Sequence, residues 1–305
     1  MMPPAFIDEK HMSQPALMIH GGAGAREGVH TTFRRYADSL ERVVEAAWLV
    51  LLEEGARAAV VAAVRALEDD PLFNAGLGSR LQADGVARMS AALMDGRRGR
   101  FSGVVNVERI RHPIDVADHL QGARHAVLAG EPASRYAREV LRMADFDPVT
   151  EHRREEYARG AAGRRGTVGA VALDAAGELW AGTSTGGVGH ETAGRMSDSA
   201  TVAGNYAGRN AAVSCTGIGE QIVDHAAAAR VVLRVEDGAG LEAAVARSLR
   251  EADERGLEYG LIALDAAGRA VAGQTREVTT LWCRRDAGGR RCFIDGERGG
   301  QTDAG

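Results

Sequence analysis

The sequence predicts an α+β fold in which helices lie outside antiparallel sheets, as in a layered αββα sandwich. Helical and strand patterns both occur along the chain, and strands in its second half are joined by hairpin turns rather than by crossovers. Glycine accounts for 39 of the 305 residues without a collagen period, which indicates many short turns and close backbone approaches. We therefore expect a site that is built partly from backbone groups.

The first half of the chain shows strand and helix patterns in succession. After a leader over residues 1–15, a short apolar run ends in a glycine-rich turn, which is typical of a strand entering a loop. Two long stretches with apolar residues at helical spacing follow, and Gly55 separates them. The elements expected here are strands over 16–19, 86–95 and 101–107 and helices over 31–51, 56–68, 113–129 and 132–143.

Residues 144–166 interrupt this order. The segment carries dense charge and has no periodic apolar face, so we expect a flexible linker. Hairpin patterns follow, and Leu-Asp-Ala-Ala-Gly occurs at both 173–177 and 264–268 as a turn between strands. The elements expected after the linker are strands over 167–174, 178–183, 211–215, 261–264, 271–274 and within 282–293, helices over 221–233 and 241–254, and a frayed end over 294–305.

The composition argues against several classes of protein. Hydrophobic residues make up 45% of the chain, which is too many for a chain that is disordered throughout. Glu45 interrupts the most apolar window, Val43–Leu52, so no membrane span is expected. Charged residues precede any apolar run in the leader, which argues against a signal peptide. A net charge of −5 argues against a nucleic-acid partner, which usually meets a basic face.

The three cysteines are Cys215, Cys283 and Cys292, and they do not make a disulfide framework in a chain of this length. They form no Cys-x-x-Cys motif and no histidines stand at matching spacing, so zinc is not expected. We expect reduced thiols and a cytoplasmic protein.

Thr167 is the first candidate for catalysis. It opens a strand directly after Gly166, the last residue of the charged linker. If the bond between them is cut, Thr167 carries a hydroxyl nucleophile and a free α-amine, whose pKa of about 7.7–8.0 suits it to act as the base. The glycine leaves room for the strained turn of an acyl shift. The alternatives are an ordinary β-branched strand residue and, for the base, a histidine such as His20 or His190.

Three further segments combine hydroxyl, charged and glycine residues. The segment Thr183–Gly187 can form a tight turn that exposes backbone N–H groups. A guanidinium grips a carboxylate and a carboxylate grips an ammonium, so Arg195 and Asp198 together match the two charges of a free amino acid. Thr216 and the N–H of Gly217 could form an oxyanion hole. The alternatives are a plain turn, a surface ion pair and a strand-to-helix turn.

Together these segments resemble the plant-type asparaginase and isoaspartyl peptidase family of N-terminal nucleophile hydrolases. The resemblance covers residues 16–275, and every motif stands in the order of the family. The matching segments are IHGGAGA at 19–25, LEDDPLFNAGLG at 67–78, MDG at 94–96, GTVGAVALD at 166–174, TSTGG at 183–187, GRMSDS at 194–199 and SCTGIGE at 214–220.

The resemblance implies a four-layer αββα sandwich of the N-terminal nucleophile hydrolase type, made as one inactive chain. The chain is then expected to cut itself between Gly166 and Thr167. The products are an α subunit of residues 1–166, which includes the flexible linker at about 144–166, and a β subunit of residues 167–305. Together they form one αββα domain, and two such αβ heterodimers are expected to form a dimer.

The resemblance also assigns roles residue by residue. The glycines at 21–22 belong to a loop that matters in self-cleavage. No cofactor is expected for the chemistry, although the loop at 67–77 resembles one that holds a structural sodium ion through backbone carbonyls. The implied ion ligands are the carbonyls of Leu67, Glu68, Asp70, Phe73, Ala75 and Leu77. The implied site residues are the nucleophile Thr167, the supporting residues Thr185 and Asn74, the α-carboxylate ligand Arg195, the α-amine ligand Asp198, and the oxyanion-site residues Thr216 and Gly217.

Several positions depart from the pattern of the family. Serine at 90 stands where the family usually has aspartate, and Asn106 stands where a small apolar residue is usual. Ser197 replaces a glycine and Ala200 replaces a proline, and the segment Val188–Glu191 is unlike the better-known members. These changes leave the acyl chemistry intact and bear on substrate preference.

The expected function is hydrolysis of L-asparagine and of β-aspartyl dipeptides through an acyl-enzyme on Thr167. Both substrates present the same free α-carboxylate and α-amine, so one Arg–Asp pair can hold either. The expected partners are these small molecules alone, with no nucleic acid and no membrane. One alternative is a glycosylasparaginase-like hydrolase, and another is an uncleaved, catalytically silent binding protein.

Overall fold

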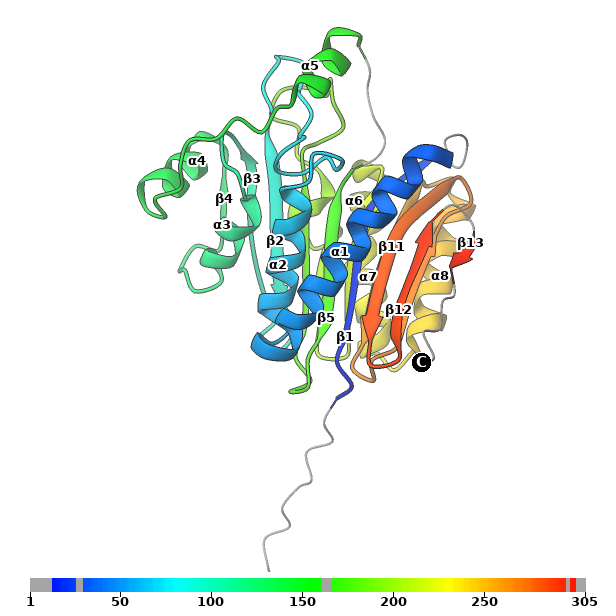
Figure 1. The fold of residues 1–305 in the computed structure, drawn as a ribbon. Helices are drawn as coiled ribbons and strands as arrows, with labels where there is room; N and C mark the ends of the chain where they lie inside the picture. The colour runs from blue at the N-terminus through cyan, green and yellow to red at the C-terminus, as the bar shows by residue number, and fades with distance from the viewer. Residues whose placement is uncertain (1–12, 26–29, 161–165, 295–296, 300–305) are drawn as a thin grey trace, which may run out of the picture.

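Two β-sheets and their covering helices form the structure, a computed structural model that describes residues 13–25, 30–160, 166–294 and 297–299 (Figure 1). The larger sheet has the strand order β13-β12-β11-β1-β5-β6-β2-β3-β4, and the smaller has the order β10-β9-β8-β7. The strands are β1 (Ala16–Ala25), β2 (Met89–Asp95), β3 (Arg100–Val107), β4 (Val127–Ala129), β5 (Val168–Leu173), β6 (Leu179–Thr185), β7 (Asn205–Ala207), β8 (Ala211–Gly217), β9 (Tyr259–Asp265), β10 (Ala270–Gln274), β11 (Val278–Asp286), β12 (Gly289–Ile294) and β13 (Glu297–Gly299).

The helices confirm the α+β class. Figure 1 shows α1 and α2 in front of the larger sheet, α7 and α8 behind, and α5 at the top, beyond the strand ends. The helices are α1 (His30–Glu54), α2 (Ala56–Glu68), α3 (Pro113–Leu120), α4 (Gly130–Glu139), α5 (Glu151–Ala158), α6 (Gly219–His225), α7 (Ala227–Glu236) and α8 (Leu241–Glu254), with a 3-10 turn at η1 (Asp198–Ala200).

Side-chain alternation along the strands builds three apolar layers. On β1, Leu17 and Ile19 belong to the cluster that packs against α1 and α2. The alternate residues Ala16 and Met18 belong to a second cluster, shared with Ile262 of β9, between the two sheets. A third cluster fills the space between the smaller sheet and helices α7 and α8. Burial on both faces explains why the central strands are apolar throughout.

The two Leu-Asp-Ala-Ala-Gly turns confirm the hairpin predictions. Asp174 accepts hydrogen bonds from the N–H groups of Ala176 and Glu178, at 3.0 and 2.9 Å, between β5 and β6. Asp265 accepts from Ala267 and Arg269 in the same way, between β9 and β10. An aspartate that bonds to its own turn sets the register of each hairpin. For β5 and β6, this register decides which side chains meet at the far end.

Three expected helices are wrong in extent, and one of them, expected over 132–143, is α4, which ends at Glu139. The helix expected over 113–129 ends at Leu120. The chain turns there, and Arg100 Nε donates a hydrogen bond to the carbonyl of Gln121 at 2.8 Å. Val127–Ala129 is instead the strand β4, which pairs parallel with β3, so the expectation of purely antiparallel sheets is also wrong. The helix expected over 221–233 is split at Ala226, whose φ of 49° is left-handed.

The segment expected to be a flexible linker contains the helix α5. Thr150 caps this helix by accepting from the N–H of Arg153 at 3.3 Å. No periodic apolar face predicted it, because the residue that α5 buries is Arg153 rather than an apolar side chain. The linker prediction is therefore wrong for 151–158, and residues 161–165 lie outside the described part of the chain.

The prediction of three reduced thiols is wrong for two of them. Cys283 and Cys292 form a disulfide across β11 and β12, where they stand directly opposite each other. Spacing along the chain does not show this, since cross-strand neighbours are decided by hairpin register. Cys215 stays a free, buried thiol. Beyond this pair, β13 lies within the end that was expected to be frayed.

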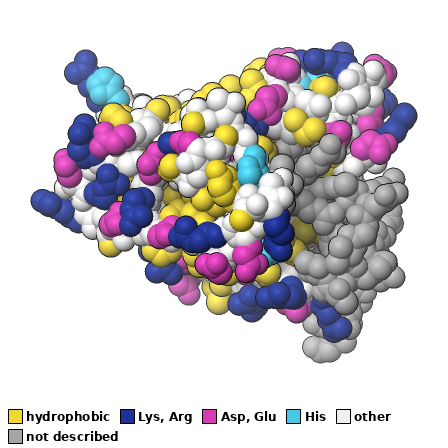
Figure 2. Space-filling model, turned by 90° about the horizontal axis from the view of Figure 1, so that it is seen from above, with side chains coloured by type: hydrophobic (Ala, Val, Ile, Leu, Met, Phe, Trp, Pro, Cys, Tyr) yellow, Lys and Arg dark blue, Asp and Glu magenta, His cyan; other side chains and the backbone are white. Residues whose placement is uncertain are grey.

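Charges of both signs are mixed on the upper face of the molecule. Figure 2 shows basic and acidic side chains interleaved over that face rather than gathered by sign. Within the described residues, none of the helices combines the length and apolar character that a bilayer crossing requires.

Candidate active site

The β5–β6 hairpin brings two threonine hydroxyls together. Thr167 lies directly before β5 and Thr185 ends β6, and the strands pair with Val168 opposite Ser184. The Oγ1 atoms of Thr167 and Thr185 lie 3.1 Å apart, within hydrogen-bonding distance. The N–H of Gly187 also donates to Thr185 Oγ1, at 3.3 Å. The hairpin thus holds a hydroxyl partner against the candidate nucleophile.

The peptide bond before Thr167 is enclosed by backbone. The N–H of Asn74 donates to the carbonyl oxygen of Gly166 at 3.0 Å. Gly166 has a φ of 133°, and a Cβ there would lie 2.1 Å from Asn74 Cβ, so only glycine fits. A Cβ on Gly22 would lie 2.6 Å from the nitrogen of Gly166, so the glycine segment packs on the same bond. This segment is part of β1, which continues to Ala25 with a register shift after His20, so the expectation that the strand ends in a turn at these glycines is wrong.

The side chain of Asn74 connects this bond to the turn after Thr185. Its Nδ2 donates to the carbonyl of Gly187, and its Oδ1 accepts from the N–H of Arg80 at 3.0 Å. The N–H of Gly186 donates to the carbonyl of Asn74 at 2.7 Å. Asn74 thus links the Gly166 carbonyl to the turn after Thr185 through hydrogen bonds of its backbone and its side chain.

A buried polar network lies next to β5. His20 Nε2 is 2.8 Å from Ser214 Oγ, which in turn lies 2.6 Å from Thr183 Oγ1. A Cβ on Gly169 would lie 2.4 Å from His20 Nε2, so glycine at 169 lets the imidazole approach the strand. Burial lowers the pKa of His20 to about 3. An imidazole with that pKa is a poor base, which favours the α-amine of Thr167 in this role.

Arg195 is held by a residue that the sequence analysis did not assign. Its Nε and Nη2 donate to the two carboxylate oxygens of Glu220, at 2.7 and 2.8 Å. This two-bond geometry is the one by which a guanidinium binds any carboxylate. Glu220 ends the segment SCTGIGE, so its place in that motif was the only available signal.

Asp198 lies beside Arg195 but is almost completely shielded from solvent. Its side chain is 3% exposed, and Oδ2 has no hydrogen-bond partner among the described residues. Burial raises the pKa of Asp198 to about 7, against the opposing effect of the Arg195 charge. A buried carboxyl oxygen without a donor is suited to receive one from a ligand.

Both charged groups converge on the start of α6. A Cβ on Gly219 would lie 2.8 Å from Arg195 Nη2 and 2.9 Å from Asp198 Oδ1. Thr216 and Gly217 end β8 immediately before this point. Since side chains alternate along a strand, Thr216 projects to the same side as Ser214, toward β6.

A family model described as "Asparaginase" matches residues 13–294. The chain belongs to the asparaginase family. An "Isoaspartyl peptidase/L-asparaginase" of Nostoc sp. is 42% identical over 96% of this chain and 96% of the relative. A protein of the same name from Synechocystis sp. is 46% identical over 86% of this chain and 85% of the relative. An "Isoaspartyl peptidase" of Salmonella typhimurium is 37% identical over 86% of this chain and 89% of the relative.

Two departures from the asparaginase pattern lie beside the site. Ser90 on β2 stands directly opposite Thr185, and its Oγ accepts from the N–H of Asn106 at 3.1 Å. Asn106 has a left-handed φ of 52°, and its Nδ2 donates to the carbonyl of Gly194 at 2.7 Å. Asn106 therefore anchors the residue directly before Arg195.

The loop of the asparaginase family that was expected to hold sodium is tightly bonded here. The carbonyl of Glu68 accepts from the N–H of Leu77 at 2.7 Å, and that of Asp70 from Phe73 at 3.1 Å. A carbonyl has two lone pairs, so these bonds are compatible with an ion. The Glu68 side chain accepts from Ser184 Oγ at 2.6 Å, and burial raises its pKa well above the usual range. Among the described residues, no three His, Cys, Asp or Glu side chains gather as a metal site.

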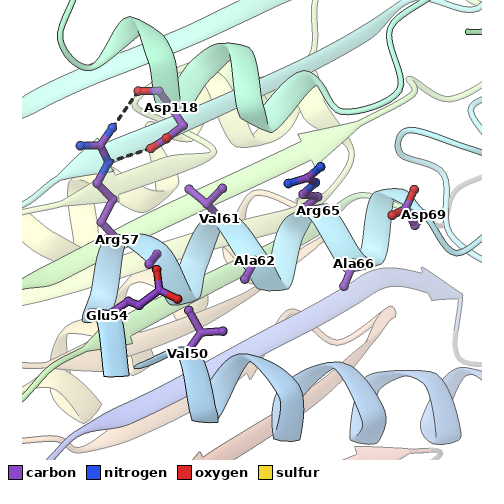
Figure 3. A pocket seen from close by; sticks show the side chains of 10 residues that line it. Val50, Glu54, Arg57, Val61, Ala62, Arg65, Ala66, Asp69 and Asp118 are labelled. Atoms are coloured by element: carbon purple, nitrogen blue, oxygen red, sulfur yellow. Dashed lines mark hydrogen bonds and ion pairs between the residues drawn. The ribbon is translucent and has the colours of Figure 1, made fainter. Parts of the chain in front are cut away.

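A groove of about 570 Å³ lies away from these residues, on the outer helices (Figure 3). Arg57 of α2 spans one end of it and donates to Asp118 of α3 at 2.7 Å. Asp69 lies in the 67–77 loop, but none of the lining residues is one of the candidate catalytic or substrate-binding residues. The groove is lined by Val50, Glu54, Arg57, Ala58, Val61, Ala62, Arg65, Ala66, Asp69 and Asp118.

Proposed function

We propose that the protein is a self-cleaving isoaspartyl peptidase/L-asparaginase with Thr167 as its nucleophile. The observation that carries this proposal is the contact between the hydroxyls of Thr167 and Thr185 beside an enclosed Gly166 carbonyl. The names of the relatives supply the substrate class, which is L-asparagine and isoaspartyl peptides. The fold type we propose is the four-layer αββα sandwich, in keeping with the three apolar layers.

Self-cleavage begins with attack of Thr167 Oγ1 on the carbonyl carbon of Gly166. The C–N bond breaks, the nitrogen takes up the proton of the hydroxyl, and an ester replaces the amide. Water then hydrolyses the ester, which leaves a carboxylate on Gly166 and a free α-amine on Thr167. The N–H of Asn74, 3.0 Å from the carbonyl oxygen, stabilises the negative charge that develops there. The products are an α subunit of residues 1–166 and a β subunit of residues 167–305.

Hydrolysis of asparagine uses the same hydroxyl. The α-amine of Thr167 accepts the hydroxyl proton, Oγ1 attacks the side-chain amide carbon, and ammonia leaves with that proton. A β-aspartyl dipeptide loses an amino acid instead of ammonia. Water then cleaves the β-aspartyl ester and releases aspartate. Thr185 Oγ1 supports the nucleophile, and Thr216 with the N–H of Gly217 holds the oxyanion.

The charged pair fixes the part of the substrate that does not react. The substrate α-carboxylate takes the place of the Glu220 carboxylate on Arg195, since both fit the same guanidinium edge. The substrate ammonium meets the buried Oδ2 of Asp198, which lacks a donor among the described residues. Binding an ammonium favours the ionised form of Asp198 and so lowers the pKa that burial has raised.

Three further features complete the proposal. A structural sodium ion is held by backbone carbonyls of the 67–77 loop, and titration of the purified enzyme with sodium should raise its melting temperature. The active unit is a dimer of αβ heterodimers, which sedimentation measures directly. We also propose that the protein acts in the cytoplasm. The Cys283–Cys292 disulfide argues against this location, because disulfides are rare in that reducing compartment.

Mass spectrometry of the purified protein tests this proposal. The unmodified chain should give two masses that correspond to a cut at 166–167, with release of ammonia from L-asparagine. Thr167→Ala should stay one 32.2 kDa chain without activity, because alanine has no hydroxyl to attack the carbonyl. Thr192→Ala, at an exposed threonine, is the matched control and should behave as the unmodified chain. Two masses from Thr167→Ala, or an intact and inactive unmodified chain, would refute the proposal.

A further inference from the structure

The helix α5 docks on the loop that holds the bond to be cut. Figure 1 shows α5 at the top of the molecule, close to the loops that follow α2. The N–H of Gly78 donates to the carbonyl of Pro148, directly before α5, at 2.7 Å. Tyr157 Oη donates to the carbonyl of Ala83 at 3.0 Å, and its ring stacks on His190 with centroids 4.6 Å apart. The helix therefore contacts both the 73–83 loop and the divergent turn after Thr185.

Arg153 is the centre of this contact. Its side chain is only 6% exposed, which is costly for a charge unless its donors are satisfied. Its Nε donates to the carbonyl of Gly78 at 2.6 Å, and Nη2 donates to the carbonyl of Phe73 at 3.4 Å. Its Nη1 pairs with Glu156 at 2.7 Å. The guanidinium thus joins the two ends of the 73–78 turn.

Asn74 stands directly after the carbonyl that Arg153 holds. The peptide unit whose oxygen accepts from Arg153 Nη2 is the same unit whose N–H donates to the Gly166 carbonyl. Oxygen and N–H of one planar peptide point in opposite directions, so fixing the oxygen fixes the aim of the N–H. The bond from a charged donor also polarises that peptide and strengthens its N–H as a donor.

We propose that Arg153 is a positioning residue for self-cleavage. Its guanidinium holds the Phe73–Asn74 peptide so that the Asn74 N–H faces the carbonyl oxygen on which negative charge develops. The inference rests on the proposed function, since it requires that the chain cuts itself at Gly166–Thr167. The role assigns a function in self-cleavage to α5, which lies in the segment that the composition predicted to be a flexible linker.

The rate of cutting tests this role. The chain is synthesised in a cell-free translation mixture, synthesis is stopped, and conversion of the full-length chain into its two products is followed on gels. Arg153→Ala should slow the first-order rate about tenfold or more, because the Asn74 N–H is no longer held in the direction of the developing oxyanion. The cutting rate of Arg153→Lys should lie between those of the unmodified chain and Arg153→Ala, because one ammonium cannot bind both carbonyls as a planar guanidinium does.

A matched control lies one residue further along the helix. Arg154 is 48% exposed on its side chain and pairs with Asp147, so Arg154→Ala should cut at the unmodified rate. Addition of millimolar guanidinium should partly restore cutting in Arg153→Ala, whereas the same concentration of urea should not. A purely structural role would not produce this selective rescue. Melting temperatures measured in the Thr167→Ala background show whether each variant is folded.

The outcomes separate the two proposals. Slow cutting in folded Arg153→Ala, with rescue by guanidinium, supports the role. Equal rates for the unmodified chain and folded Arg153→Ala would overturn the inference and leave the proposed function standing. If Arg153→Ala does not fold, Arg153→Lys is the deciding variant. Cutting of Arg153→Lys at the rate of the unmodified chain would overturn the inference. An unmodified chain that is never cut would overturn both.

Discussion

Replacing Asp198 by asparagine should remove a pH dependence of stability that the buried carboxyl creates. The folded protein raises the pKa of Asp198 from 3.8 to about 7, mainly through burial. Between these values the folded state holds a proton that the unfolded state has lost, so stability falls as pH rises. The full difference between the folded and unfolded pKa lowers the free energy of unfolding by about 4 kcal/mol, of which about 3 kcal/mol is lost between pH 5 and pH 8.

The assay compares melting temperatures at pH 5 and pH 8 in the Thr167→Ala background, which keeps the chain intact. For a chain of this length, a loss of about 3 kcal/mol lowers the melting temperature by about 5 °C. The melting temperature of the parent should therefore fall about 5 °C further than that of Asp198→Asn between the two pH values. Other titrating groups are common to both proteins and cancel in this comparison.

The change in melting temperature between pH 5 and pH 8 tests the pKa of Asp198 better than the stability of Asp198→Asn at a single pH. At a single pH, the new asparagine adds a cost of its own, because it buries an amide N–H₂ without an acceptor. Asp224→Asn, at an exposed aspartate, is the control and should keep the full pH dependence of the parent. Equal losses in the parent and in Asp198→Asn would refute the assignment of a strongly raised pKa to this carboxyl.

Arg195→Ala should weaken turnover of both L-asparagine and β-aspartyl dipeptides by about 2–5 kcal/mol in kcat/KM, while self-cleavage persists; unmodified turnover would remove Arg195 from the site. The pH profile of kcat should rise through one group, the α-amine of Thr167, at or below about 7.7–8.0. That rise should survive in His190→Ala and in His20→Ala, and its loss in either would make a histidine the base. The profile of kcat/KM should carry a second ionisation, because the free enzyme must also ionise Asp198.

The charge state of Asp198 links stability to function. A carboxyl that is shielded and partly protonated without substrate costs folding energy at neutral pH. The same shielding makes an incoming ammonium a strong partner, because few other donors compete for Oδ2. Under the proposed function, the substrate ammonium binds Asp198, whose Oδ2 has no donor among the described residues, and the substrate α-carboxylate displaces Glu220 from Arg195.

Local patterns in the sequence determined much of the fold. The helix Ala56–Glu68 was predicted with its bounds, since apolar spacing and Gly55 mark it. The hairpin that places Thr167 beside Thr185 was predicted because Asp174 and Gly177 dictate their own turn. The order Gly166-Thr167 before a strand, together with the family motifs, pointed to the reacting bond. Each of these signals, taken singly, is carried by a few neighbouring residues.

Only the tertiary structure decided which distant groups meet. The pairing of Arg195 with Glu220, the bond from Asn74 to Gly166 and the contact of Arg153 with the carbonyl of Gly78 join residues far apart in the chain. The Cys283–Cys292 disulfide depends on strand register, and β4 joins β3 in parallel rather than continuing a helix. Burial also decides the pKa values of His20 and Asp198. The physical reason is that desolvation and long-range hydrogen bonds depend on the packing of the whole chain, whereas propensity and turn chemistry act between neighbours.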